Sequence, residues 1–224
     1  DQDRVETVTY RKDAQKAIIR YVSTNGNRVL TTDEVTGKSG EAIAYSTTSQ
    51  ITEFKKQGYN LVSDEFTAGG AKVYDYDTAR DQVYTVTLSE RVEPVNPDNP
   101  TPQPNTPVNP GQPDSPRWPG TVENLDNKES VNRTIHYVYE DGSKAKDDVV
   151  ETLNFKRWSN VNLVTGHIDF QDWTTNDDTF DKVVSPTIAG YTADKSEVPA
   201  VSGVQAKDQD RVETVTYRKD AQKA

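Results

Sequence analysis

Residues Arg133–Gly142, RTIHYVYEDG, decide the fold of the second half of this chain because they predict a β-strand that ends in a tight turn. β-Branched and aromatic residues favour strands, and an Asp-Gly pair allows the positive φ angle that reverses the chain into a hairpin. The same pattern stands in the first half, where Ile19–Val22 is followed by Asn25-Gly26. Each half therefore begins with a predicted antiparallel hairpin.

Two further landmarks come after these hairpins in the same order. Gly58-Tyr59 corresponds to Gly190-Tyr191, and the pattern VYTVTL at 83–88 corresponds to VETVTY at 212–217. In both closing strands the residues alternate between two faces, which predicts one buried and one solvated face. Three landmarks in one order indicate that the two halves arose by duplication.

The segment between the landmarks predicts a helix in the first half. Thr47–Gln50 has the pattern of a capping box, Ile51 and Phe54 share one side at helical spacing, and Gly58 is placed to end the helix. We expect this helix over Thr48–Gln57, packed across a sheet.

The second half lacks this helical signal. Alternation at Leu153–Phe155 and Ile168–Phe170, with Thr165-Gly166 as a turn, predicts an additional hairpin. Only the short segment Phe180–Val184, before Pro186, is compatible with a helical turn.

Proline dominates the middle of the chain, where ten of the 12 prolines fall between Pro94 and Pro119. Such a segment lacks many backbone donors and favours polyproline II, so it predicts a semi-rigid spacer that could reach roughly 85 Å at about 3.1 Å per residue. The alternative is an ordered loop that packs back on a domain.

The chain ends repeat each other, since Asp1–Ala17 recurs letter for letter as Asp208–Ala224. This identity predicts one period of a tandem array, and arrays build reach and multivalency. Arg211–Arg218 should be a strand of the second domain. Its first copy has lost that domain, and it can fray or add to an exposed sheet edge.

Composition limits the classes of partner. Only 32% of the 224 residues are hydrophobic, which suggests two small cores. The net charge of −10 argues against nucleic acid and anionic lipid, and no apolar run is long enough to insert into a membrane. Without cysteine there is neither a disulfide nor a thiolate zinc site.

These observations predict an α+β chain of two small domains. The expected ranges are 1–16 for the tail of a preceding repeat, 17–91 for the first domain, 92–120 for the linker, 121–219 for the second domain and 220–224 for the joint to the next repeat.

At the landmarks the chain resembles the repeats of mucus-binding surface proteins of lactobacilli, built from MucBP-type domains. The first half, from AIIRYV to DQVYTVTL, is similar to the smaller domain of that repeat, and the second, from RTIHYVYEDG to RVETVTYRK, to the larger one. The resemblance implies two ubiquitin-like β-grasp domains in an elongated adhesin on a Gram-positive cell surface, anchored to the cell wall outside this segment. It also implies mucin glycans as partners and no catalytic residues. Immunoglobulin binding is reported for the family as well.

The sequence offers few residues of the kinds that catalytic sites use. His136 and His167 stand without cysteine or a nucleophile elbow, so a structural or exposed role is expected for both, and the chain is not expected to be an enzyme.

No cofactor is required by these residues, although calcium is one hypothesis. Its candidate ligands are Asp169, Asp172, Asp177 and Asp178, near Asn176 and Asp181. They offer oxygen donors but lack EF-hand spacing, and a plain acidic loop is the alternative.

Aromatic side chains are the candidates for sugar contact, because a pyranose ring stacks on an aromatic face. Trp118, Tyr139, Trp158 and Trp173 stand among polar residues. A tryptophan in a small domain also often belongs to the core, and that alternative stays open.

The expected function is therefore a cell-surface adhesin repeat that binds mucus weakly by itself and strongly in tandem with neighbouring repeats. Two alternatives remain, an immunoglobulin-binding module and a purely structural stalk.

Overall fold

A computed structural model describes residues 2–223 of the chain. Over this range the protein is mostly β with one α-helix, and its contacts divide it into two units. Of the described residues, unit 1 comprises 2–93, 102–123 and 160–168, and unit 2 comprises 94–101, 124–159 and 169–223.

Unit 1 is built on a four-stranded sheet in the order β2-β1-β4-β3. Its strands are β1 (Ala14–Ser23), β2 (Arg28–Lys38), β3 (Tyr59–Asp64) and β4 (Gln82–Glu90). β1 and β2 form the predicted antiparallel hairpin, and β4 lies parallel to β1. The closing strand buries Val86 and Leu88 fully, as its alternation predicts.

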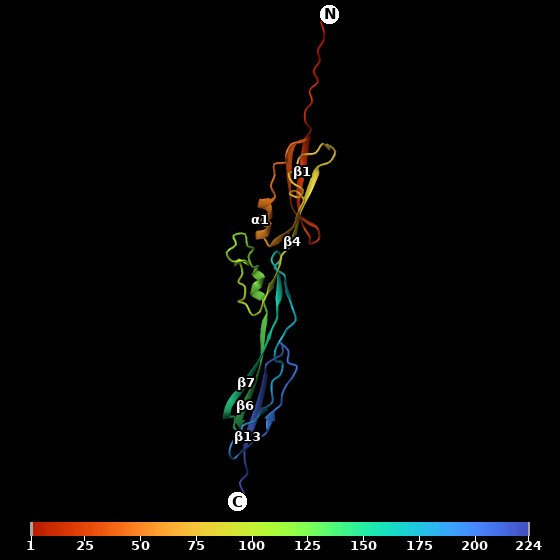
Figure 1. The fold of residues 1–224 in the computed structure, drawn as a ribbon. Helices are drawn as coiled ribbons and strands as arrows, with labels where there is room; N and C mark the ends of the chain where they lie inside the picture. The colour runs from red at the N-terminus through yellow and green to blue at the C-terminus, as the bar shows by residue number, and fades with distance from the viewer. Residues whose placement is uncertain (1, 224) are drawn as a thin grey trace. The chain divides into compact units, whose positions relative to one another are not determined.

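Helix α1 (Thr48–Lys56) confirms the predicted helix of the first half and lies alongside the sheet of unit 1 (Figure 1). Ile51 and Phe54 are its buried residues, and they pack into the core with Tyr21 and Tyr59. The expected capping box is wrong, because the Thr47 hydroxyl makes no cap and instead donates to the Asp64 carboxylate at 2.6 Å.

Unit 2 repeats the same sheet plan in the order β11-β13-β6-β7. Its strands are β6 (Lys128–Tyr139), β7 (Lys144–Lys156), β11 (Tyr191–Ala193) and β13 (Arg211–Lys219). β6 and β7 form the predicted hairpin and β13 lies parallel to β6, so these three strands run side by side in Figure 1. The shared order supports the duplication indicated by the landmarks.

Shorter elements complete the chain. They are β5 (Val92–Val95), β8 (Ser159–Asn162), β9 (Ile168–Phe170), β10 (Val183–Val184), β12 (Glu197–Val198) and a 3-10 helix, η1 (Gly120–Asn124). β5, β8 and β9 form a three-stranded sheet, so a further hairpin exists and β9 is the expected second strand. Its first strand is β8, because Leu153–Phe155 belongs to β7 and pairs with β6. The helical turn expected at Phe180–Val184 is wrong, because Phe180 bridges Val201 and β10 pairs with β12.

Unit 2 has no helix over its sheet among residues 2–223, and its core is closed by extended segments instead. One cluster joins Val131, Leu153 and Phe155 of the hairpin to Phe180 and Val204. A second cluster lies around Tyr137 and Tyr217. Non-local packing therefore replaces the helix that covers unit 1.

The proline-rich segment folds back on itself and is not the extended spacer that its composition predicts. Trp118 donates its backbone N–H to the Thr106 carbonyl and accepts a hydrogen bond from the Asn105 N–H, both at 2.9 Å. Val108 donates to the Pro116 carbonyl at 2.9 Å. Proline retains its carbonyl acceptor, so a loop can close around prolines when other residues supply the donors. The alternative of an ordered loop matches the structure.

This closure differs from the continuous ranges expected for the domains. Residues 102–120 of the expected linker lie in unit 1, and so do 121–123 and 160–168 of the expected second domain. The hairpin 160–168 is held there by hydrogen bonds from the Leu163 N–H to the Arg91 carbonyl and from the Asn162 amide to Glu90.

Residues 2–13 form no strand, and β1 begins at Ala14. Over the described range 2–223, the structure contains no helix of the length and apolar character that crossing a membrane requires.

Candidate functional site

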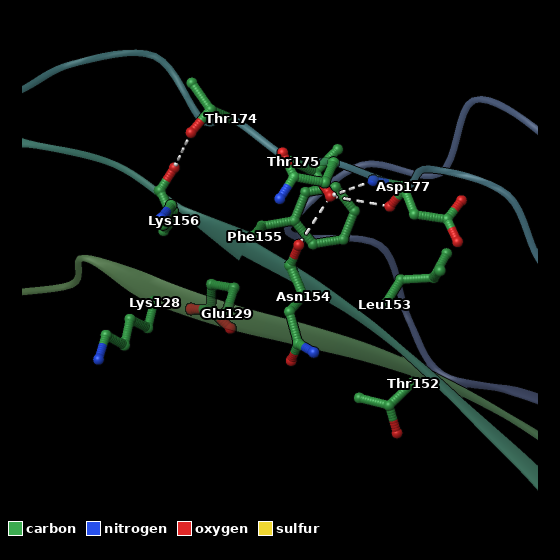
Figure 2. A pocket seen from close by; sticks show the side chains of 11 residues that line it. Lys128, Glu129, Thr152, Leu153, Asn154, Phe155, Lys156, Thr174, Thr175 and Asp177 are labelled. Atoms are coloured by element: carbon green, nitrogen blue, oxygen red, sulfur yellow. Dashed lines mark hydrogen bonds between the residues drawn. The ribbon is translucent and has the colours of Figure 1, made fainter. Parts of the chain in front are cut away.

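A pocket of about 460 Å³ in unit 2 is the candidate site (Figure 2). Nine of its 11 lining residues have a hydroxyl, amide, carboxylate or ammonium group, although apolar atoms make up most of the exposed lining surface. The lining consists of Lys128, Glu129, Thr152, Leu153, Asn154, Phe155, Lys156, Thr174, Thr175, Asn176 and Asp177. The pocket therefore offers both donors and acceptors to a polar ligand.

The end of β7 and the segment after Trp173 build this pocket together. Lys156 and Thr174 exchange two backbone hydrogen bonds of 2.9 and 2.8 Å. The Thr175 hydroxyl donates to the Asn154 carbonyl at 2.7 Å and accepts from the Asp177 N–H, as the dashed lines in Figure 2 show. Hydrogen bonds therefore hold β7 and the segment after Trp173 together. Because side chains alternate along β7, Thr152 and Asn154 are exposed while Leu153 between them is buried.

Charged residues surround one side of the pocket. The Lys207 ammonium contacts the Asp126 carboxylate at 2.6 Å and also bonds to Glu129, which lines the pocket. Burial by itself would raise the pKa of Asp126, but its hydrogen bonds with Lys207 and Glu129 and the charges of Lys207 and Arg157 outweigh this and lower the pKa. Asp126 therefore stays ionised and holds both cations in place.

Arg157 forms an aromatic sandwich beside this cluster. Its guanidinium carbon lies 4.0 Å from the ring centre of Phe170 and 4.2 Å from that of Trp173. Its Nε also donates to the Asp126 carbonyl at 2.8 Å. Arg157 was not identifiable from the sequence, because residues so far apart in the chain carry no joint local pattern.

The sequence-predicted aromatic residues do not gather in one place. Trp173 packs partly buried against the unit 2 core and precedes the pocket residue Thr174. Trp158 is 42% exposed, and its carbonyl accepts from the Gln171 N–H. Tyr139 packs on Tyr191 with ring centres 4.8 Å apart.

Trp118 lies in unit 1, half-buried at the closure of the proline loop. Of the four candidates, Trp158 is therefore the most open aromatic surface, and Tyr139 is a packing residue.

The four candidate calcium ligands are exposed and do not gather into a metal site. Asp177 accepts from the Thr179 N–H at 2.9 Å, and Asp178 accepts from the Thr179 hydroxyl at 3.0 Å. Among residues 2–223 no three His, Cys, Asp or Glu side chains are grouped so that they could hold a metal ion. Asp169 and Asp172 are likewise exposed. Asp177 and Asp178 thus make local turn bonds, and calcium binding by this segment stays a prediction.

Of the four calcium candidates, Asp177 lines the pocket, whereas neither histidine does. His136 contacts Asp148 at 2.9 Å across the β6–β7 hairpin, with both side chains about two-fifths exposed, at 41% and 42%. His167 accepts the Asn162 N–H at its carbonyl in the 160–168 hairpin.

Two family models match the chain, one on each half. A model described as Mucin binding domain matches residues 15–90, and one described as Muc B2-like domain matches residues 122–221. The chain belongs to the mucus-binding protein repeat family. The residues of both hairpins and both closing strands lie inside these matches, so the resemblance stated from the sequence is confirmed.

Solved structures agree with this assignment. The crystal structure of Mub-RV is 25% identical, covers 92% of this chain and 100% of its own, and has a TM-score of 0.72. The type 2 repeat of the mucus binding protein MUB from Lactobacillus reuteri is 28% identical over 92% of this chain and 100% of its own, with a TM-score of 0.57.

A MucBP domain from Lactobacillus acidophilus is 36% identical over 43% of this chain and 96% of its own, with a TM-score of 0.37. No curated protein matches the chain significantly by sequence.

Proposed function

We propose that this chain is an extracellular adhesin repeat that binds mucin glycans without catalysing a reaction. The observation that carries this proposal is the match of residues 15–90 to the mucin-binding model together with the polar pocket in unit 2. The proposed location is the surface of a Gram-positive cell, with anchoring to the cell wall supplied by other parts of the polypeptide.

We place the glycan at the unit 2 pocket. Sugar hydroxyls need donors and acceptors at close spacing, and Thr152, Asn154 and Asn176 supply both kinds of group. Lys128 adds a positive charge for glycans that carry a carboxylate or sulfate. Trp158 does not line this pocket, and it is proposed as an additional stacking surface because of its exposure.

The fold that presents this pocket is proposed to be a variant of the β-grasp. In both units the closing strand lies parallel to the first strand and between that strand and a short antiparallel one. In unit 1 a helix crosses the sheet, as the β-grasp requires.

Retention of the 224-residue chain on immobilised mucin, with release by free glycans, tests the proposal. The change Asn154→Ala should lower retention about tenfold, since one hydrogen bond to a ligand contributes about 1 kcal/mol or more. Asn60→Ala, at an exposed position of β3 in unit 1, is the matched control and should bind normally. Equal retention of both variants would contradict the placement of the glycan in this pocket.

Separate variants test whether aromatic side chains contact the glycan. Trp158→Ala should lose retention, whereas Tyr76→Ala, which removes a 77% exposed aromatic ring in unit 1, should not. If Trp118, Trp158 and Trp173 can each be truncated without loss, the aromatic contact is to be dropped. Retention should persist in a calcium chelator, because among residues 2–223 no three acidic or histidine side chains are grouped so that they could hold a metal ion. Loss of retention in the chelator would support the calcium hypothesis.

Single repeats are proposed to bind weakly and arrays strongly. Linked sites raise the local concentration, so avidity can exceed single-site affinity by about 10²–10⁴. Retention should therefore rise steeply from one repeat to several. Binding to antibody fragments but not to mucin would favour the immunoglobulin-binding alternative, and binding to neither would favour the structural stalk.

A further inference from the structure

The same sequence occupies two different environments in this structure. Val8 and Tyr10 are 74% and 91% exposed, whereas their second copies, Val215 and Tyr217, are 0% and 1% exposed in the core of unit 2. The reverse holds after the strand, where Gln15 is buried and its second copy, Gln222, is exposed. Each copy thus shows one half of the surroundings of a single segment.

The second copy shows the contacts on the N-terminal side of the joint. Lys219, the last residue of β13, pairs with Tyr191. The next residue, Asp220, donates its N–H to the Gly190 carbonyl at 2.9 Å, and its carboxylate accepts from the Thr192 hydroxyl. Unit 2 therefore uses the amide and the carboxylate of this aspartate.

The first copy shows the contacts on the C-terminal side of the joint. The carbonyl of Asp13 accepts from the Ser39 N–H at 3.1 Å. Pairing of β1 with β2 begins at the next residue, Ala14, opposite Lys38. The buried Gln15 amide donates to the Ser39 hydroxyl at 3.3 Å. Unit 1 therefore uses the carbonyl of the same aspartate.

We propose that consecutive repeats share this aspartate as a joint clamped from both sides. The proposal rests on the tandem arrangement that the proposed function includes. The two sets of bonds use different atoms, so both can be made at once: the preceding repeat binds the amide and carboxylate, and the next repeat binds the carbonyl. One residue separates the last pair of β13 from the first pair of β1, which leaves no flexible linker.

The consequence is that one repeat restricts the orientation of the next. A free linker lets neighbouring domains sample many orientations, whereas a bonded joint selects few. The interaction surface is formed by Gly190 and Thr192 of one repeat and by Ser39 of the next, and its partner is a second copy of this chain.

A two-repeat chain tests the joint, made by continuing residues 1–224 with a second copy of residues 18–224. Because the chain has no cysteine, two spin labels can be placed uniquely, at Val150→Cys in the first repeat and Val29→Cys in the second. Both valines are exposed, at 62% and 50%. Double electron–electron resonance then gives the distribution of distances across the joint.

The native joint should give one narrow distribution, and inserting Gly-Ser-Gly-Ser after Asp220 should broaden it. Thr192→Val should shift the distribution toward that of the inserted chain, whereas Thr214→Val, at an exposed position of β13 away from the joint, should not. A native distribution as broad as that of the inserted chain would overturn the proposal. Retention on mucin is measured on the single 224-residue chain, so a chain that fails to bind mucin but keeps a narrow distribution would overturn the function and leave the joint standing.

Discussion

At the scale of single residues, the buried guanidinium of Arg133 connects several segments of unit 2. Its side chain is 1% exposed, and it donates to Glu151 at 2.6 Å, to the Pro199 carbonyl at 2.7 Å and to the Asp181 carbonyl. It also lies 5.2 Å from the ring centre of Phe180. One side chain thus joins β6 to β7 and to two loop segments.

Arg133→Ala should therefore destabilise the protein by about 3–5 kcal/mol, because it leaves the partners of a buried cation unpaired. Urea unfolding measures this change. Arg211→Ala, at the exposed register partner of Arg133 on β13, should change stability by less than about 0.5 kcal/mol. Similar unfolding midpoints for the two variants would contradict the structural role of Arg133.

The lowered pKa of Asp126 makes a second prediction at this scale. Its folded pKa lies below its unfolded value, so its contribution to stability is complete above the unfolded pKa of about 3.9 and is lost as pH falls through the folded pKa. The free energy of unfolding of Asp126→Asn should therefore fall less steeply than that of the native chain as the solution is acidified. If the difference in the free energy of unfolding between the native chain and Asp126→Asn stayed constant from pH 7 to pH 2, this linkage would be excluded.

At the scale of elements, the end of α1 depends on the approach of the 160–168 hairpin. Gly58 has φ +101°, and a Cβ there would lie 2.9 Å from the Leu163 carbonyl carbon. Its counterpart Gly190 has φ +79° and nothing within 4 Å of such a Cβ. Both glycines have a positive φ angle, but only at Gly58 would an added Cβ collide with a neighbouring segment.

Gly190→Ala should cost about 1–2 kcal/mol from the left-handed backbone alone, and Gly58→Ala should cost clearly more because the hairpin must also move. Thermal unfolding of both variants measures the difference. Equal losses of stability in the two variants would mean that the Leu163 backbone can move away from the added Cβ without destabilising the protein.

At the scale of the whole molecule, the division into units makes the expected domain limits testable. Trypsin should cut first after Arg4 and Arg11, which lie in the exposed segment before β1. Arg117 should be cut much later, because its neighbours close the proline loop and its guanidinium donates to the Asn105 carbonyl at 2.6 Å. Early cleavage after Arg117 would favour the spacer expected from composition.

Local sequence by itself determined the elements whose signals lie within a few residues. The alternation of Ile19–Val22 and of Ile135–Val138, the Asn-Gly and Asp-Gly turns, and the spacing of Ile51 and Phe54 are local features, and the hairpins and α1 result from them. The candidate site was predictable only in part, since Asp177 is the one residue proposed from the sequence that lines the pocket, and it was proposed as a calcium ligand.

Tertiary structure decided the rest, because the deciding contacts join residues far apart in the chain. The ten clustered prolines predict an extended segment. Backbone hydrogen bonds that join Asn105 and Thr106 to Trp118, and Val108 to Pro116, close it into a loop instead. Arg157 gains its aromatic contacts only when the fold brings Phe170 and Trp173 to its guanidinium. Identical sequences at Val8 and Val215 differ from exposed to fully buried because only the second copy has β6 as its neighbour. A local pattern specifies which face a strand can bury, and only the fold supplies what covers that face.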